Sequence, residues 1–325
     1  GLAGVRFAAP IPYGLRLGVS WVGDRNQYLG LRDSDGDGRP DIVDDFPDDK
    51  EWYVDTDGDG LDDRFPLEWD IDGDGITDTL NSDIPGWNLD TMIVLDTSIM
   101  RKPEPLNVNT ESETFNSFAF DIGIPILNEG QLSIDLYAQF AALIGKTEHP
   151  IEEKKENAGY GIIPLGLSAR FGPATLNFEF RRMPIGRFEF GYFDRSYEVE
   201  RAIFQGTGGN QGRIVTKSNT LGKYREQSGF YSSLNLDLGS LFDARMAFQN
   251  LNGNQYDTEL NEIVNASNQS FTAILKLKKT ISKIESANWF YQQRNVPNPF
   301  DFEYSESTIL GYNIGLRLGN GMVLT

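Results

Sequence analysis

Between Asp33 and Asp78 the motif D-x-D-G-D-G-x-x-D occurs three times. Each copy places carboxylates at positions 1, 3, 5 and 9 of a loop that glycines bend. Oxygens at this spacing suit a cation that accepts about six to eight ligands at flexible angles, which favours calcium over the strictly octahedral magnesium. The predicted Ca²⁺ ligands are Asp33, Asp35, Asp37, Asp41 and Asp44, then Asp55, Asp57, Asp59 and Asp63, then Asp70, Asp72, Asp74 and Asp78.

The same segment carries most of the charge of the chain. Residues 33–78 hold 17 Asp, 2 Glu and 3 Lys or Arg, a net of −16, whereas all 325 residues sum to −19 and the remainder therefore to −3. Such a loop would repel itself without a counter-charge, so metal binding would supply free energy that its few apolar residues cannot. The alternative interpretation is a disordered acidic linker.

The residues after the motif separate two calcium-binding families. An EF-hand needs a bidentate Glu at position 12, where this chain has Asp44, Pro66 and Asn81. With Phe46-Pro47 and Phe65-Pro66 after the first two copies, residues 33–80 resemble bacterial thrombospondin type 3 repeats. The resemblance implies a segment without regular secondary structure that wraps around its ions. The cysteines of the animal members are absent, so metal alone would hold it.

The bulk composition limits the class of protein. A length of 325 residues allows one large β domain or two smaller ones, and no run reaches the ~18 apolar residues of a transmembrane helix. The absence of cysteine excludes disulfides and thiolate metal sites. The chain starts at Gly1 without a signal-like stretch, which we interpret as processing or trimming. Abundant Gly, Asn, Phe and Tyr indicate β structure.

Outside the acidic segment, apolar and polar residues alternate with period two. Side chains alternate faces along a strand, so each stretch predicts a strand with one apolar and one polar face. The apolar sets are Leu15/Leu17/Val19/Trp21, Leu132/Ile134/Leu136/Ala138/Phe140, Leu176/Phe178/Phe180, Leu234/Leu236/Leu238, Ala273/Leu275/Leu277 and Tyr312/Ile314/Leu316/Leu318.

Two architectures produce this alternation. A soluble sandwich buries the apolar face between sheets, and an outer-membrane barrel turns it toward lipid. Strands of about 9–12 residues favour the barrel, because a tilted strand of about that length crosses a bilayer. Aromatic residues near the expected strand ends also favour it, as in interfacial girdles. These are Trp21, Tyr160, Phe171, Phe190, Tyr192, Phe230, Trp289 and Tyr291.

The connections alternate between short and long, which is typical of outer-membrane barrels. Short turns are predicted at Pro10–Pro12, Asn128–Gly130, Gly172–Pro173, Gly239–Phe242, Lys279–Ser282 and Gly319–Gly321, and long loops at 23–115, 145–158, 183–225, 252–268 and 294–306. The apolar stretch Met92–Leu95 then belongs to the first loop. The prediction is an all-β, antiparallel transmembrane barrel of about twelve or more strands. The last strand barely begins at Met322, so we expect further sequence to complete the barrel.

The domain division follows from these loops. Residues 1–22 form a first barrel hairpin, 23–115 a long extracellular loop with the calcium repeats, and 116–325 the remaining strands. Residues 1–22 and 116–325 resemble bacterial outer-membrane β-barrel proteins. The resemblance implies the outer membrane as location, the lipid bilayer as partner and loops at the cell surface.

No catalytic constellation can be assembled from the sequence. The single histidine, His149, lies in a polar stretch and is interpreted as an exposed loop residue. The net charge of −19 disfavours nucleic acid as a partner. Charged residues assigned to the lumen could set up a field across a pore, or pair and close it. They are Arg16, Arg170, Arg245, Lys276, Lys278 and Arg317, against Asp121, Asp135, Glu179 and Asp237.

The function predicted is passive and without enzymatic chemistry. The chain would be a porin-like channel or a structural surface protein, whose calcium module can also contact a protein partner. The first alternative is a secreted or surface-anchored calcium-binding adhesin, and the second is a barrel enzyme. The sequence leaves the transported solute and the oligomeric state open.

Overall fold

The structure of the chain is a computed structural model. It describes residues 1–55, 60, 62, 104–194, 196–205, 213–257, 260–301, 308–319 and 322–324. The chain divides into two compact units, apart from Gly1. Unit 1 comprises Arg25–Thr114 and Ser196–Lys217, and unit 2 comprises Leu2–Asp24, Phe115–Arg195 and Ser218–Thr325. The predicted apolar stretch Met92–Leu95 lies outside the described residues.

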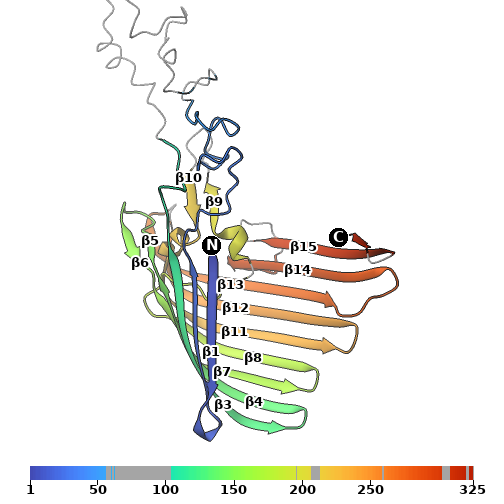
Figure 1. Cartoon of the computed structure of the whole chain (residues 1–325). Coiled ribbons are helices and arrows are strands. Elements are labelled where there is room, and N and C mark those ends of the chain that lie inside the picture. The colour runs from blue at the N-terminus through green and yellow to red at the C-terminus, as the bar shows by residue number, and fades with distance from the viewer. Residues whose placement is uncertain are drawn as a thin grey trace, which may run out of the picture. The chain divides into compact units, whose positions relative to one another are not determined.

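Unit 2 is built on one large antiparallel sheet (Figure 1). Its neighbours in order are β1 (Leu2–Pro10), β2 (Arg16–Asp24), β3 (Phe115–Glu129), β4 (Leu132–Ile144), β7 (Tyr160–Phe171), β8 (Ala174–Met183), β11 (Tyr224–Leu238), β12 (Phe242–Asp257), β13 (Glu262–Leu277), β14 (Ile284–Val296), β15 (Ile309–Gly319) and β16 (Met322–Leu324). Eleven of these strands have nine to sixteen residues, and β16 has three. The all-β, antiparallel prediction is confirmed.

The sheet is open at both ends in the described part of the chain. β1 pairs only with β2, and β16 only with β15, so the described strands form no closed barrel. The sheet bends strongly. In Figure 1, β1–β3 stand nearly upright, whereas β11–β15 run across the view. Closure therefore remains a proposal.

The short turns occur where the sequence places them. Gly130, Gly172 and Gly239 follow β3, β7 and β11 directly, and each adopts a positive φ that a tight turn requires. One long loop is predicted wrongly. Residues 252–268 belong mostly to β12 and β13, which continue to Asp257 and resume at Glu262 with paired backbones throughout. The Asn- and Gln-rich composition resembles a loop, but ladder hydrogen bonding extends the hairpin regardless of side-chain polarity.

The two faces of the sheet differ as the alternation predicts. The outer face, which carries Phe178, Phe230 and Phe248, has ring centroids 6.2 and 5.9 Å apart on successive strands β8, β11 and β12. The inner face carries their alternating neighbours, among them Glu179 and Tyr231, which are register partners. This arrangement gives one apolar and one polar surface from the same strands.

The predicted aromatic girdle is only partly correct. Trp21, Tyr160 and Phe171 lie within three residues of a strand end, as predicted, whereas Phe230 and Trp289 lie in the middle of β11 and β14. Trp21, Phe230 and Trp289 are 40, 38 and 42 % exposed, as side chains at an outer face would be. Tyr291 is buried: its ring lies 6.1 Å from the ring of Phe271, and its hydroxyl donates to the Pro299 carbonyl of the following loop at 3.5 Å. Phe190 and Tyr192 do not lie at a strand end. They belong to the segment after β8.

The connections contain short elements. β5 (Lys146–Glu148) and β6 (Lys155–Asn157) form a small hairpin in unit 2, and β9 (Ala202–Gln205) pairs with β10 (Arg213–Thr216) in unit 1. The helical pieces are η1 (Pro12–Gly14), α2 (Tyr197–Glu200) and η2 (Asn219–Lys223). None of the helices in the described ranges is both long and apolar enough to cross a membrane.

Candidate metal centre

The first repeat folds into a tight loop without regular secondary structure. Gly36 and Gly38 have φ values of +77° and +99°, which a side chain would disfavour, and they turn the chain between successive aspartates. The Asp41 amide closes the loop by donating to the Arg32 carbonyl at 2.8 Å. The glycines at positions 4 and 6 of the motif are therefore conformational requirements of the loop.

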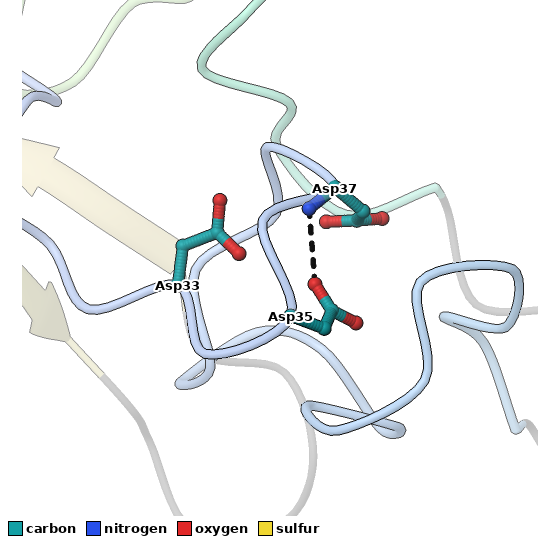
Figure 2. Close-up of side chains that lie close together, drawn as sticks. All are labelled: Asp33, Asp35 and Asp37. Carbon is teal, nitrogen blue, oxygen red and sulfur yellow. Dashed lines mark hydrogen bonds between the residues drawn. The ribbon is translucent and has the colours of Figure 1, made fainter.

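Three predicted ligands converge in this loop. One carboxylate oxygen each from Asp33, Asp35 and Asp37 lies within 4.8 Å of the others, and all three residues are half-buried. Figure 2 shows the three side chains on one turn of the chain, with the Asp37 amide donating to Asp35 Oδ1 at 3.0 Å. Asp33 accepts from the amides of Gly36 and Gly38 at 2.7 and 3.0 Å. These backbone donors fix the orientation of the Asp33 and Asp35 carboxylates.

Two carboxylate oxygens near this cluster are buried without a hydrogen-bond partner among the residues that the structure describes. They are Asp35 Oδ2 and Asp44 Oδ2, and Asp44 as a whole is 6 % exposed. Burial, together with the charges of Asp37 and Asp35, raises the pKa of Asp44 to about 6. An unpaired buried carboxylate is costly, and a bound divalent cation would offset that cost. The donor set fits calcium, because it consists of carboxylate oxygens, which are the ligands that calcium prefers.

Arginine and serine side chains engage other acids of the repeat. The Arg39 guanidinium donates to Asp37 Oδ2 at 2.9 Å and stacks 3.6 Å over the Tyr53 ring. Both oxygens of Asp41 accept from Ser34, at 2.7 and 2.8 Å, and this hydrogen bonding lowers the pKa of Asp41. Asp41 thus closes the loop in this structure, and its role as a ligand stays a prediction.

The second repeat is described only in part. Asp55 Oδ2 accepts from the Gly60 amide at 3.0 Å, which is the contact expected of position 1. Asp57, Asp59 and Asp63 lie outside the described residues, as do Asp70, Asp72, Asp74 and Asp78 of the third repeat.

The motif does not include one buried acid of the second repeat. Asp62 is 1 % exposed, and its carboxylate accepts from the amides of Tyr53 and Val54 at 2.7 and 3.2 Å. The motif leaves this position open, so spacing gives no signal for it. Asp62 ties the second repeat to the segment that follows the first.

The chain returning from the module packs on the first repeat. The Val108 amide donates to the Gly38 carbonyl at 2.7 Å, and Asn109 Nδ2 donates to the Asp37 carbonyl at 3.3 Å. A Cβ at Gly38 would overlap Asn107 and Asn109. Gly38 is therefore required twice, for its positive φ and for this close approach.

The histidine is not exposed, contrary to the interpretation of its sequence context. His149 is 8 % exposed, and its Nδ1 accepts from the amides of Ile151 and Glu152 at 3.3 and 3.0 Å. Its Nε2 lies 3.3 Å from the Tyr256 hydroxyl, a partner 107 residues away. Because Nδ1 accepts two backbone hydrogen bonds, the neutral ring carries its proton on Nε2. The same two bonds order the β5–β6 loop around the ring.

No known family model matches the chain, and no curated protein matches it.

Proposed function

We propose that the chain is an integral β-barrel protein of a bacterial outer membrane, with the lipid bilayer against the outer face of its large sheet. The observation that carries this proposal is the exposure of apolar and aromatic side chains along nearly the whole outer face. Exposed fractions run from 38 % at Phe230 to 79 % at Tyr312. Others in this set are Phe118, Phe120, Phe140, Leu176, Phe178, Phe180, Met246, Leu275, Trp289, Ile314 and Leu316.

Such a surface is unusual for a protein in water. Soluble monomers rarely expose contiguous apolar patches larger than a few hundred Å². A secreted sandwich would cover this face with a second large sheet, but the other sheets among the described residues, β5–β6 and β9–β10, have two strands each. This comparison favours the membrane barrel over the soluble adhesin.

The inner face supports the same assignment. Its charged side chains meet across one intervening strand: Arg6 of β1 binds Asp121 of β3 at 2.8 and 3.0 Å, and Lys278, directly after β13, reaches Asp237 of β11 at 2.8 Å. Arg16 lies 3.8 Å from Asp135. Arg170, Arg245 and Lys276 form no ion pair within the described part of the chain. A polar inner face with paired and unpaired charges suits a wet lumen.

Extraction and gel behaviour test the barrel. We expect the folded protein to need detergent or lipid and to migrate differently before and after boiling, because closed strand hydrogen bonding resists denaturation without heat. Full solubility without detergent, with unchanged migration on boiling, would assign the chain to the soluble adhesin class.

We propose further that the module at residues 33–78 binds calcium and projects from the cell surface. Asp35→Asn and Asp44→Asn should weaken calcium binding, because each removes charge from an oxygen that is buried without a partner. Asp48→Asn is the matched control, since Asp48 is exposed and outside the motif. Calorimetry on the full chain should place the affinity at roughly 10⁻⁵–10⁻³ M. No calcium-dependent heat, with unchanged protease sensitivity in chelator, would refute the module.

The role proposed is passive: a pore, or a surface scaffold whose calcium module contacts a protein partner. Planar bilayers separate the two, because a pore conducts whereas a scaffold stays silent and captures its partner only with calcium. No covalent chemistry is part of the proposal.

A further inference from the structure

The segment between β8 and Asp194 runs along the inner face of the sheet. We call residues 184–194 the inner strap. Tyr192 of the strap packs on Phe115 of β3, with ring centroids 4.9 Å apart, while Glu189 reaches β14. Six strands lie between β3 and β14 in the sheet. The strap therefore crosses the inner face from one part of the sheet to another.

Arg294 of β14 holds one part of the strap. Its guanidinium lies 3.3 Å from Glu189 Oε1 and also contacts the Asp194 carboxylate. The neighbouring Asn295 donates to the same Glu189 oxygen at 3.1 Å. The Arg294 and Glu189 side chains are only 11 and 12 % exposed, so this is a part-buried charge pair with further hydrogen bonds. Removing one partner of such a pair is strongly destabilising, because the remaining charge is left buried without compensation.

The beginning of the strap is fixed through its backbone. The Arg187 amide donates to the Tyr224 carbonyl at 3.0 Å, and the Gly159 amide donates to the Arg187 carbonyl at 2.8 Å. Phe188 is 3 % exposed, and its ring lies where a Cβ at Gly161 would be. Backbone bonds at one end and an ion pair at the other define a single position for the strap.

The strap separates two cavities on the inner face. One of about 300 Å³ is lined from β11 to β14 by Tyr231, Gln249, Thr272 and Gln292. The other, of about 270 Å³, is lined by Ser117, Gln139 and apolar residues of β2 to β7. Strap residues 189–191 and 194 line both cavities. The strap is the wall between them.

The charges on this wall compensate one another. Arg181 lines both cavities, donates to Glu179 at 2.7 Å and stacks 3.8 Å from Tyr231 and 4.7 Å from Phe190. Arg294 pairs with both Glu189 and Asp194, and the two arginines and two acids that line the larger cavity sum to zero charge. Apart from these paired ions, the larger cavity offers amides, hydroxyls and aromatic rings. A charged solute would compete with existing ion pairs, whereas a neutral polar solute can replace water at the amides and hydroxyls.

From this geometry we infer that the inner strap is the selectivity element of the barrel, admitting small uncharged polar solutes of the sugar class. The inference depends on the proposed pore, and the strap is the part that sets size and chemistry. Arg294 is a positioning residue, since it acts by holding the strap.

Cysteine labelling tests the strap without any transport. The chain has no cysteine, so Thr272→Cys places one thiol beneath the strap, and Ser168→Cys places a half-buried control on the inner face outside both cavities. In detergent-folded protein we expect Thr272→Cys to label more slowly than the control. Adding Arg294→Gln should raise the labelling rate of Thr272→Cys by roughly tenfold or more. Glu189 and Asp194 then lose the cation that holds them to β14, so the strap leaves the inner face more often. Equal rates at both cysteines, or no response to Arg294→Gln, would overturn the strap and leave the barrel standing.

Swelling of proteoliposomes tests the solute class. Wild type should admit a neutral pentose or hexose faster than gluconate or glucosamine of similar size. Arg294→Gln, and independently Glu189→Gln with Asp194→Asn, should admit larger neutral sugars, whereas Arg170→Gln should leave the size limit unchanged. Each variant is first checked for heat-dependent gel migration, so a failure to fold is recognised. If correctly folded protein passes no sugar, the proposed solute class is wrong, even where the strap slows the labelling of Thr272→Cys. Loss of the migration shift in wild type would refute the barrel itself.

Discussion

Replacing Leu234 by Arg tests most directly whether the outer face meets lipid. Leu234 lies on β11 four residues from Phe230 and four from Leu238, which are 38 and 51 % exposed on the same face. At about 3.4 Å per residue, the distance from Phe230 to Leu238 is roughly 27 Å along the strand. A strand tilt of about 45° reduces this to roughly 19 Å along the membrane normal. That distance fits within the apolar band of outer-membrane barrels, about 25 Å tall, with Leu234 near its middle.

The expected cost therefore depends on depth. Leu234→Arg should lower the free energy of unfolding in lipid vesicles by about 2–4 kcal/mol, and Leu238→Arg by about 0–1 kcal/mol. Asn177→Arg is the control on the inner face of β8, where it loses one hydrogen bond to Ser233 at 3.0 Å. That loss should cost about 1 kcal/mol.

Denaturant titration of vesicle-folded protein, followed by heat-dependent gel migration, gives the three values. Equal costs at Leu234 and Leu238, or an unchanged stability for Leu234→Arg, would show that this face does not cross a membrane. A cost at Leu234 that is the same in detergent-free buffer would instead indicate packing against protein.

Three further predictions concern unit 1. Chelation should expose residues 33–55 to protease while the β signal in circular dichroism persists, because no metal contributes to the strand ladder; joint loss of both would make the sheet and module one cooperative unit. Gly38→Ala should cost the module about 1–3 kcal/mol, through its φ of +99° and the overlap with Asn109, and more than Gly36→Ala, which meets open space. Protease protection in calcium measures both, and equal effects would contradict the close-approach argument. Asp62→Ala should cost about 1.5–3 kcal/mol by removing two charge-assisted hydrogen bonds, and an unaffected module would refute that role.

The sheet could be predicted because each strand carries its own evidence. Alternation fixes which face is apolar. Gly130, Gly172 and Gly239 mark turns, because a tight turn needs a positive φ that glycine adopts without strain, whatever lies elsewhere in the chain. Where the outcome depends on distant contacts, the sequence misleads. The polar stretch around Asn252 and Asn254 is strand because Ser267 and Asn265 pair with it.

The acidic site could be predicted in part for the same reason. Carboxylate spacing within nine residues brings Asp33, Asp35 and Asp37 together, and hydrogen bonds within the loop orient Asp33 and Asp35. The burial of His149 depends on Tyr256, and the strap depends on Arg294, which lies 105 residues from its partner Glu189. A dense run of aromatic residues at 188–193, inside an otherwise polar connection, is the one sequence signal that could have indicated the strap.

Unit 1 links the calcium module to a connection that has no calcium motif. Glu113, at the end of the first long connection, accepts from Tyr28 at 3.4 Å and from Thr216 of β10 at 3.0 Å. Lys217, the residue after Thr216, is 6 % exposed and forms a part-buried ion pair with Glu200 at 2.7 Å. Buried polar networks are stable only when every member keeps its partner. The position of β9–β10 therefore depends on the stem of the acidic module. If the repeats bind calcium as proposed, the free energy of binding would also stabilise this segment, which lies more than a hundred residues later in the chain.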